Sequence, residues 1–145
     1  PIAYPESVNT VEGMTFDRNN NIWFVAEGKL WHVAMNSGSG TTNTAYQLDG
    51  YSNLRGITYG VIGGFDAILV LANDDIDSTS TVLRVAPNDP TTIIDSIELD
   101  IPVLSIGFAQ GIDHHLYGTP LAAGVESHLV KFACLPFDSG GLCSN

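Results

Sequence analysis

Short runs of apolar and β-branched residues recur along the chain, separated by clusters of glycine, asparagine, aspartate and proline. No segment keeps apolar residues at the i, i+3, i+4, i+7 spacing of an amphipathic helix. Ile68-Leu69-Val70-Leu71-Ala72 is apolar throughout, as expected for a strand covered on both faces. Leu83-Arg84-Val85 alternates instead, as expected for a strand with one polar face. The pattern therefore predicts an all-β protein built from short strands.

One phrase of this pattern occurs three times. Phe16, Tyr59 and Phe108 occupy equivalent positions in it, 43 and 49 residues apart. A repeat of this length made of short strands is typical of β-propeller blades. The sequence predicts one propeller-like domain over 1–145, with three four-stranded antiparallel blades at about 11–53, 54–103 and 104–137.

The expected strands lie at 13–16, 21–26, 29–34 and 44–48; at 56–59, 67–72, 81–86 and 93–99; and at 104–108, 114–118 and 128–133. Residues 17–21 and Glu27-Gly28 suit tight turns, and 60–64 and 73–80 are expected as longer loops. The third blade lacks a fourth strand, which residues 2–4 are expected to supply, for this chain or for a neighbour. Because three blades cannot close a ring, we expect self-association, or a different chain, to cover the open blade edges.

Charge narrows the classes of partner. Sixteen acidic residues against 5 basic ones give a formal net charge of −11. Binding to nucleic acid or to anionic lipid needs clustered lysine and arginine, and the sequence has no such cluster. No apolar run approaches the roughly 20 residues of a membrane helix. We therefore expect no nucleic-acid partner and no membrane insertion.

Two cysteines favour an extracellular location. Cys134 and Cys143 flank a short loop that contains glycine and proline, and a disulfide between them would fasten this C-terminal loop in an oxidising compartment. Two free buried thiols in a cytosolic protein are the alternative. The start of the chain, Pro1-Ile2-Ala3-Tyr4, has neither an initiator methionine nor a signal-peptide pattern, so we expect that any targeting segment has already been removed.

The densest acidic cluster contains Asp74, Asp75 and Asp77. Carboxylate oxygens at alternating positions suit Ca²⁺, the one cofactor for which the residues suggest a site, although the spacing is not that of an EF-hand. A solvated loop between strands is the default interpretation. His114 and His115, with His128 farther along the chain, suggest metal or acid–base chemistry, but neighbouring side chains on a strand point to opposite faces. The basic position of the third strands, which includes His32, is interpreted as structural, facing solvent or a carboxylate. Trp23 and Trp31 fit the apolar pattern and are expected in the core rather than on a sugar-stacking face.

The phrase Glu12-Gly13-Met14-Thr15-Phe16-Asp17, followed by Asn21-Ile22-Trp23-Phe24-Val25-Ala26, resembles blades of NHL-repeat and gluconolactonase-like (senescence marker protein) propellers. The likeness is good in the first repeat, fair in the second and poor in the third. Those lactonases hold a divalent metal in the central channel through the glutamate of the Glu-Gly motif. The resemblance therefore implies Glu12 as a metal ligand, but Arg55 and Leu104 stand at the equivalent positions of the other repeats.

Three functions remain open at this point. The first is an extracellular, non-catalytic binding or structural module that assembles through its blade edges and has a carbohydrate or protein ligand. It is favoured because no convergent set of catalytic residues is visible in the sequence. The second is a metal-dependent lactonase or esterase-like hydrolase that uses Glu12. The third is a subunit of an extracellular filament.

Overall fold

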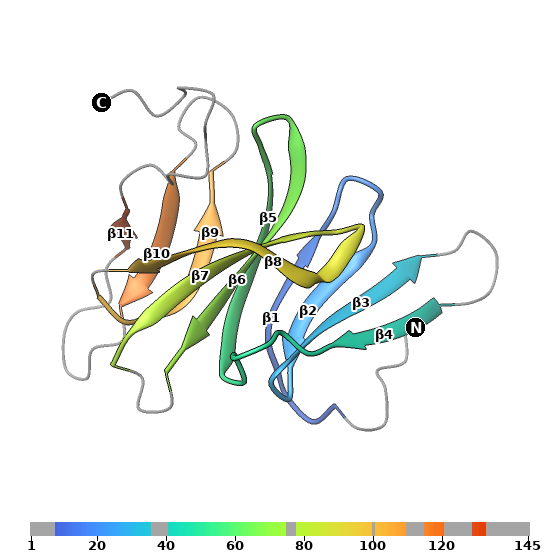
Figure 1. Ribbon diagram of the computed structural model, residues 1–145, viewed down its shortest axis with the longest axis horizontal. Helices are drawn as coiled ribbons and strands as arrows, with labels where there is room; N and C mark the ends of the chain where they lie inside the picture. Colours follow the sequence, from blue (N-terminus) through green and yellow to red (C-terminus); the bar gives the residue numbers. More distant parts are fainter. Residues whose placement is uncertain are drawn as a thin grey trace.

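The computed structural model describes residues 8–35, 41–74, 78–99, 101–109, 115–120 and 129–132. These residues form three antiparallel sheets, which follow one another across the molecule (Figure 1). The described part of the chain contains no helix long and apolar enough to cross a membrane.

Each sheet is a meander in which consecutive strands are neighbours. The first contains β1 (Val11–Phe16), β2 (Ile22–Ala26), β3 (Lys29–Met35) and β4 (Thr41–Tyr46). The second contains β5 (Leu54–Ile62), β6 (Phe65–Asn73), β7 (Ser80–Ala86) and β8 (Asp89–Leu99). The third contains β9 (Val103–Phe108), β10 (Leu116–Pro120) and β11 (Val130–Lys131). The all-β class and the division into three antiparallel sheets are thus confirmed, with three strands described in the last sheet.

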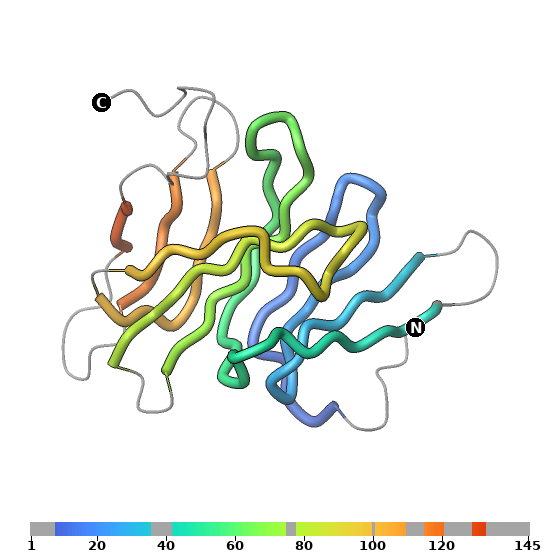
Figure 2. The backbone as a smooth tube through the Cα atoms, in the orientation of Figure 1, coloured from blue at the N-terminus to red at the C-terminus, as the bar shows by residue number. Residues whose placement is uncertain are grey.

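Most of the expected turns form, with one correction. Asn20, Glu27 and Gly28 adopt positive φ, as the turns at 17–21 and 27–28 require. Residues 60–64, however, do not form the expected loop. The strands continue to a two-residue turn at Gly63 and Gly64, so this hairpin projects beyond the rest of its sheet (Figure 2). Gly60 lies inside β5, and its role there is close packing: a Cβ at this position would come within 2.4 Å of the Phe108 ring.

The sheets pack face to face through two apolar clusters. The cluster between the first and second sheets contains Trp23, Val25, Leu30, Leu54, Ile57, Ile68, Val70, Leu83 and Val85. The cluster between the second and third sheets contains Ile62, Leu69, Leu71, Val82, Leu99, Val103 and Leu116. The second sheet is therefore covered on both faces, which explains why Ile68-Leu69-Val70-Leu71-Ala72 is apolar throughout.

The first strand of each sheet approaches the first strand of the next at equivalent repeat positions, β1 against β5 and β5 against β9. A Cβ on Gly13 would lie 3.3 Å from the Gly56 Cα, and a Cβ on Gly56 would lie 3.4 Å from the Ser105 Cα. Glycine at the first two positions permits this close backbone approach.

A buried polar network fixes the third sheet on the second. The Asn73 amide donates to the Val103 carbonyl at 3.1 Å, and the Ser80 hydroxyl donates to Asn73 Oδ1 at 2.8 Å. The same hydroxyl accepts the Val103 N–H at 2.9 Å. These bonds satisfy polar groups that would otherwise be costly to bury.

Candidate binding pocket between the first two sheets

The principal pocket lies between the first and second sheets and has a volume of about 510 Å³. The β1–β2 turn, β2 and β3 form one wall, and the β5–β6 hairpin, the β7–β8 turn and β8 form the other. The lining residues are Asp17, Asn19, Asn21, Trp23, His32, Phe65, Asp66, Ala86, Pro87, Asn88 and Ile94. Amides, carboxylates and apolar side chains therefore meet in one hollow.

Asp17 organises the turn at one end of this pocket. Its Oδ1 accepts the backbone N–H groups of Asn19 and Asn21 at 2.8 and 2.9 Å. Its Oδ2 accepts the Asn21 amide at 3.1 Å and the Trp23 indole N–H at 3.0 Å. Burial raises the pKa of Asp17, but these hydrogen bonds to the charged form outweigh burial and hold the pKa below its usual value. The Asp17 carboxylate therefore stays ionised, and its four hydrogen bonds to the protein give it a structural role.

His32 lies on β3, directly across from Trp23 on β2. The two rings are stacked with their centroids 4.1 Å apart, and Trp23 itself is only 1% exposed. The His32 Nε2 atom is buried and has no hydrogen-bond partner. Burial lowers the pKa of His32, and the nearby Asp17 carboxylate only partly opposes this. The imidazole is therefore held in its neutral form in the pocket wall.

This neutral imidazole predicts a pH dependence of stability. Because the folded-state pKa of His32 is lowered, the unfolded chain takes up a proton first as pH falls through about 6.5. The free energy of unfolding should then decrease, by at most about 1.4 kcal/mol per pH unit, until the folded-state pKa is reached. We expect His32→Gln to flatten this part of the curve of unfolding free energy against pH, measured by urea titration from pH 7.5 to 5. An unchanged slope in the variant would show that another group causes it.

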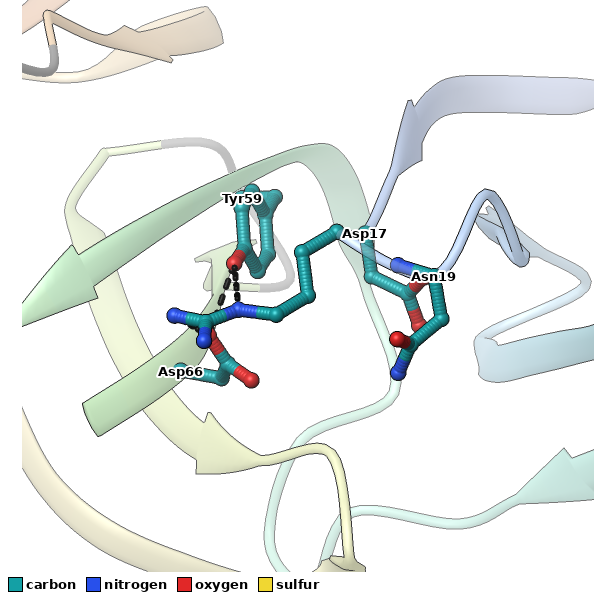
Figure 3. Close-up of polar contacts among 5 residues, drawn as sticks. Asp17, Asn19, Tyr59 and Asp66 are labelled. Atoms are coloured by element: carbon teal, nitrogen blue, oxygen red, sulfur yellow. Dashed lines mark hydrogen bonds and ion pairs between the residues drawn. The ribbon is translucent and has the colours of Figure 1, made fainter.

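Arg18, Tyr59 and Asp66 form a polar cluster, called the clasp below, that connects the two walls of the pocket (Figure 3). The Tyr59 hydroxyl donates to Asp66 Oδ1 at 2.7 Å. Arg18, on the β1–β2 turn, lies 2.6 Å from the same Asp66 oxygen and donates from Nε to the Tyr59 hydroxyl at 3.3 Å. Burial is the main reason why the pKa of Tyr59 is raised, so the phenol stays protonated and keeps donating. The clasp holds the β5–β6 hairpin against the β1–β2 turn.

The open side of the pocket has an apolar rim and exposed amides. Phe65, next to the hairpin turn, is 79% exposed, and Ile94 on β8 is 49% exposed. Asn19 and Asn88 are exposed on opposite walls. A ligand that enters would meet an aromatic face on one side and groups that both donate and accept hydrogen bonds on the other.

Glu12, the metal ligand implied by the resemblance, lies away from this pocket. Its carboxylate is 3.8 Å from the guanidinium of Arg55, which stands at the equivalent position of the second repeat. In the described part of the chain, no group of three or more histidine, cysteine, aspartate or glutamate side chains gathers in a geometry suited to a metal ion. A positively charged side chain of the protein, Arg55, thus lies beside Glu12.

The acidic cluster is only partly described. The Asp74 carboxylate accepts the Ser78 N–H at 2.6 Å and the Ser78 hydroxyl. Asp74 also lines a second hollow of about 300 Å³ with Tyr51 and Asn73. Asp75 and Asp77 lie outside the described residues, so the Ca²⁺ site remains a prediction.

Several other predicted residues also lie outside the described part: Cys134, Cys143, His114, His128 and residues 2–4. The disulfide and the additional strand therefore stay predictions. His115 is described just before β10, where its carbonyl accepts the Ala109 N–H at 3.0 Å. Trp23 and Trp31 are both buried, as expected, and lie on opposite faces of the first sheet.

The recurring basic position of the third strands has a different partner in each sheet. His32 stacks on Trp23, Arg84 makes a double hydrogen bond with Asp95 at 2.6 and 2.8 Å, and the Lys131 ammonium lies 6.0 Å from the Tyr117 ring centroid. His32 is half-buried, so the alternative in which it faces a carboxylate, here Asp17, describes it better than the solvent-facing one.

Sequence reasoning missed the pocket itself. Phe65, Asp66 and Asn88 belong to hairpin ends of the second repeat and carry no motif. Their relation to Asp17 and His32 arises only when the two sheets pack.

In comparisons with known proteins, no family model and no curated protein matches the chain.

Proposed function

We propose that this protein is an extracellular, non-catalytic binding module, and that the pocket between the first two sheets takes a neutral, polyhydroxylated ligand of the carbohydrate class. The observation that carries the proposal is the lining, which combines an exposed aromatic ring, Phe65, with the exposed amides Asn19 and Asn88. Amides both donate and accept hydrogen bonds, as hydroxyl groups do, and an aromatic ring can cover the apolar C–H face of a sugar.

Charge favours a neutral ligand over a cationic one. Asp17 already accepts four hydrogen bonds, and Asp66 is paired with Arg18 and Tyr59. Both carboxylates are therefore compensated before any ligand arrives. A cation would have to compete with these partners, whereas a neutral ligand needs only the amides and the apolar rim.

The size of the pocket agrees with this class of ligand. Its volume of about 510 Å³ lies within the roughly 300–1,000 Å³ range of small-molecule sites. The clasp between Arg18, Tyr59 and Asp66 ties the two walls together, so the pocket is formed before binding and little ordering cost is added.

We further propose that the three sheets are propeller blades. The support is the approach of β1 to β5 and of β5 to β9 at equivalent positions, the face-to-face packing of successive sheets, and the resemblance of the first repeat to NHL-repeat and gluconolactonase-like blades. In this arrangement the ligand pocket lies between adjacent blades.

Binding to a panel of neutral mono- and oligosaccharides, measured by isothermal titration calorimetry, tests the proposed function. For a saccharide that binds, we expect Phe65→Ala to weaken the affinity about tenfold, a loss of about 1.4 kcal/mol. Leu129→Ala is the matched control, because Leu129 is also an exposed large apolar residue, at 64%, but lies outside the pocket.

Two results would contradict the proposal. The first is an absence of binding across the neutral panel together with binding of small organic amines. The second is a saccharide affinity that Phe65→Ala and Leu129→Ala change equally, since the pocket would then have no special part in binding.

A further inference from the structure

The two contacts between successive sheets follow the same arrangement. Small residues on the first strand of one sheet face large apolar residues on the first strand of the following sheet. Between the first two sheets, Gly13 of β1 lies against Ile57 of β5, with the Ile57 Cγ2 only 3.5 Å from the position of a Cβ on Gly13. Tyr59, two residues along β5, packs on the cluster between these sheets. Thr15 shares the face of Gly13, because side chains two residues apart point the same way.

The second interface repeats this arrangement. Gly56, Thr58 and Gly60 of β5 face Ile106 and Phe108 of β9. The Phe108 ring lies over Gly60, and the Phe108 N–H donates to the Thr58 hydroxyl at 3.2 Å. Ile106 and Phe108 both belong to the cluster between these sheets. Both interfaces thus combine a glycine-containing strand with an aliphatic and an aromatic side chain.

The first sheet presents the same large residues with no sheet against them in the described structure. Met14 and Phe16 are equivalent to Ile57 and Tyr59 of the second repeat, yet they are 52% and 55% exposed, whereas Ile57 is 5% exposed. They pair across the sheet with Phe24 and Ile22. Trp31 and Val33 continue this apolar face, against which Val8 and Val11 pack. Met35, at 43% exposure, extends it.

The third sheet presents the complementary small residues on its far face. Ser105 and Gly107 of β9 are equivalent to Gly13 and Thr15 of β1. Ser105 is exposed, and a Cβ on Gly107 would meet nothing within 4 Å. The Ser105 hydroxyl is hydrogen-bonded to the Thr119 hydroxyl at 2.9 Å. Tyr117, which pairs with Gly107 across the sheet, lies on the same face, and the Lys131 ammonium is 6.0 Å from its ring centroid.

From this complementarity we infer that the outer face of the third sheet of a second copy of the chain packs on the Met14–Phe16 face of the first sheet. Met14 and Phe16 would pack against Ser105 and Gly107, the equivalents of Gly56 and Thr58, as Ile106 and Phe108 pack against β5 of the second sheet. The contact is head to tail, so two copies related by a two-fold axis make it twice and close, whereas a different rotation gives polymers through the same contact. The inference is independent of the proposed ligand.

Sedimentation velocity on the 145-residue chain, over a range of micromolar concentrations, tests the contact with two variants. Met14→Glu/Phe16→Glu places charges on the first-sheet face, and Gly107→Arg places a bulky, charged side chain on the far face of the third sheet, where a Cβ would meet nothing within 4 Å. All three positions are at least partly exposed, so folding, checked by circular dichroism, should survive. We expect the wild type to associate and each variant alone to be monomeric.

Mixing the variants gives the decisive result. Each retains the face that the other has lost, so an equimolar mixture should recover association through one intact contact, more weakly than the wild type. Three outcomes would overturn the inference: a monomeric wild type, association that survives in both variants, or loss of association in the Met14/Phe16 variant alone. The last would mean that first sheets pair with each other. Phe65→Ala should not change association, which separates this test from that of the ligand pocket.

Discussion

Replacing Asp17 with alanine should lower the free energy of unfolding by about 3 kcal/mol, because the change removes charge-assisted hydrogen bonds and leaves the Trp23 indole N–H buried without an acceptor. The Asn19 and Asn21 N–H groups lose the same acceptor, so the β1–β2 turn is weakened as well. Urea denaturation at pH 7, followed by tryptophan fluorescence, measures the effect.

Asp17→Asn is the matched control for this prediction. The amide keeps one acceptor oxygen but places an NH₂ group opposite donors, so a loss intermediate between the wild type and Asp17→Ala is expected. The wild type should also lose stability in acid, because the lowered pKa of Asp17 stabilises the fold above about pH 3.8 and this contribution disappears as pH falls through the folded-state pKa. Equal stability of Asp17→Ala and wild type at pH 7 would contradict the structural role.

Replacing Gly28 with alanine should be similarly damaging, with a loss of about 3 kcal/mol or more, since two penalties add. Gly28 has a φ of +69°, and a Cβ there would lie 2.5 Å from the Ser52 carbonyl oxygen. The neighbour is backbone and cannot rotate away, so the link between the first and second sheets would have to shift. Thermal and urea unfolding of the variant measure the loss.

Gly50→Ala separates the two penalties. Gly50 has a φ of +84° but nothing within 4 Å of its Cβ position, so this variant should lose only about 1–2 kcal/mol, the cost of the left-handed backbone. The difference between the two variants then gives the cost of contact with Ser52. If both lose the same amount, the close approach of the β2–β3 turn to Ser52 does not contribute.

The pocket and the proposed assembly contact use opposite faces of the first sheet. Trp23 and His32 face the second sheet and line the pocket, whereas Phe24 and Trp31, stacked with ring centroids 5.8 Å apart, lie on the other face. A ligand in the pocket therefore would not block association. This separation allows each proposal to be tested with variants that leave the other site unchanged.

The sequence predicted the assembly surface differently. It indicated that open blade edges would need covering, because unpaired strand edges invite association. The contact that we propose uses the sheet faces, since both internal contacts bury apolar faces and repeat the same pairing of small and large residues. The covering of open edges stays a prediction.

The sequence by itself determined the strands and most of the turns. Alternating apolar residues share one face only in a strand, and short continuous apolar runs bounded by turn residues are too short for most helices. Asn20 and Gly28 adopt the positive φ that the predicted turns require. The threefold repeat likewise predicted three antiparallel sheets. The prediction of a loop at 60–64 was wrong, because Gly60 lies within β5, where the absence of a side chain makes room for the Phe108 ring. A glycine in the sequence is compatible with a loop or with close packing inside a strand, and only the residue packed against it in the folded structure decides between them.

The tertiary structure alone decided the site. Arg18 meets Asp66, and Glu12 meets Arg55, across gaps of more than 40 residues in the chain. The short-range periodicity of the sequence specifies which face of a strand is apolar, but it does not specify which face of another sheet will lie opposite. The pocket consists of the hairpin ends that remain uncovered when two twisted sheets pack, so its residues come together through the packing of the sheets and not through any motif.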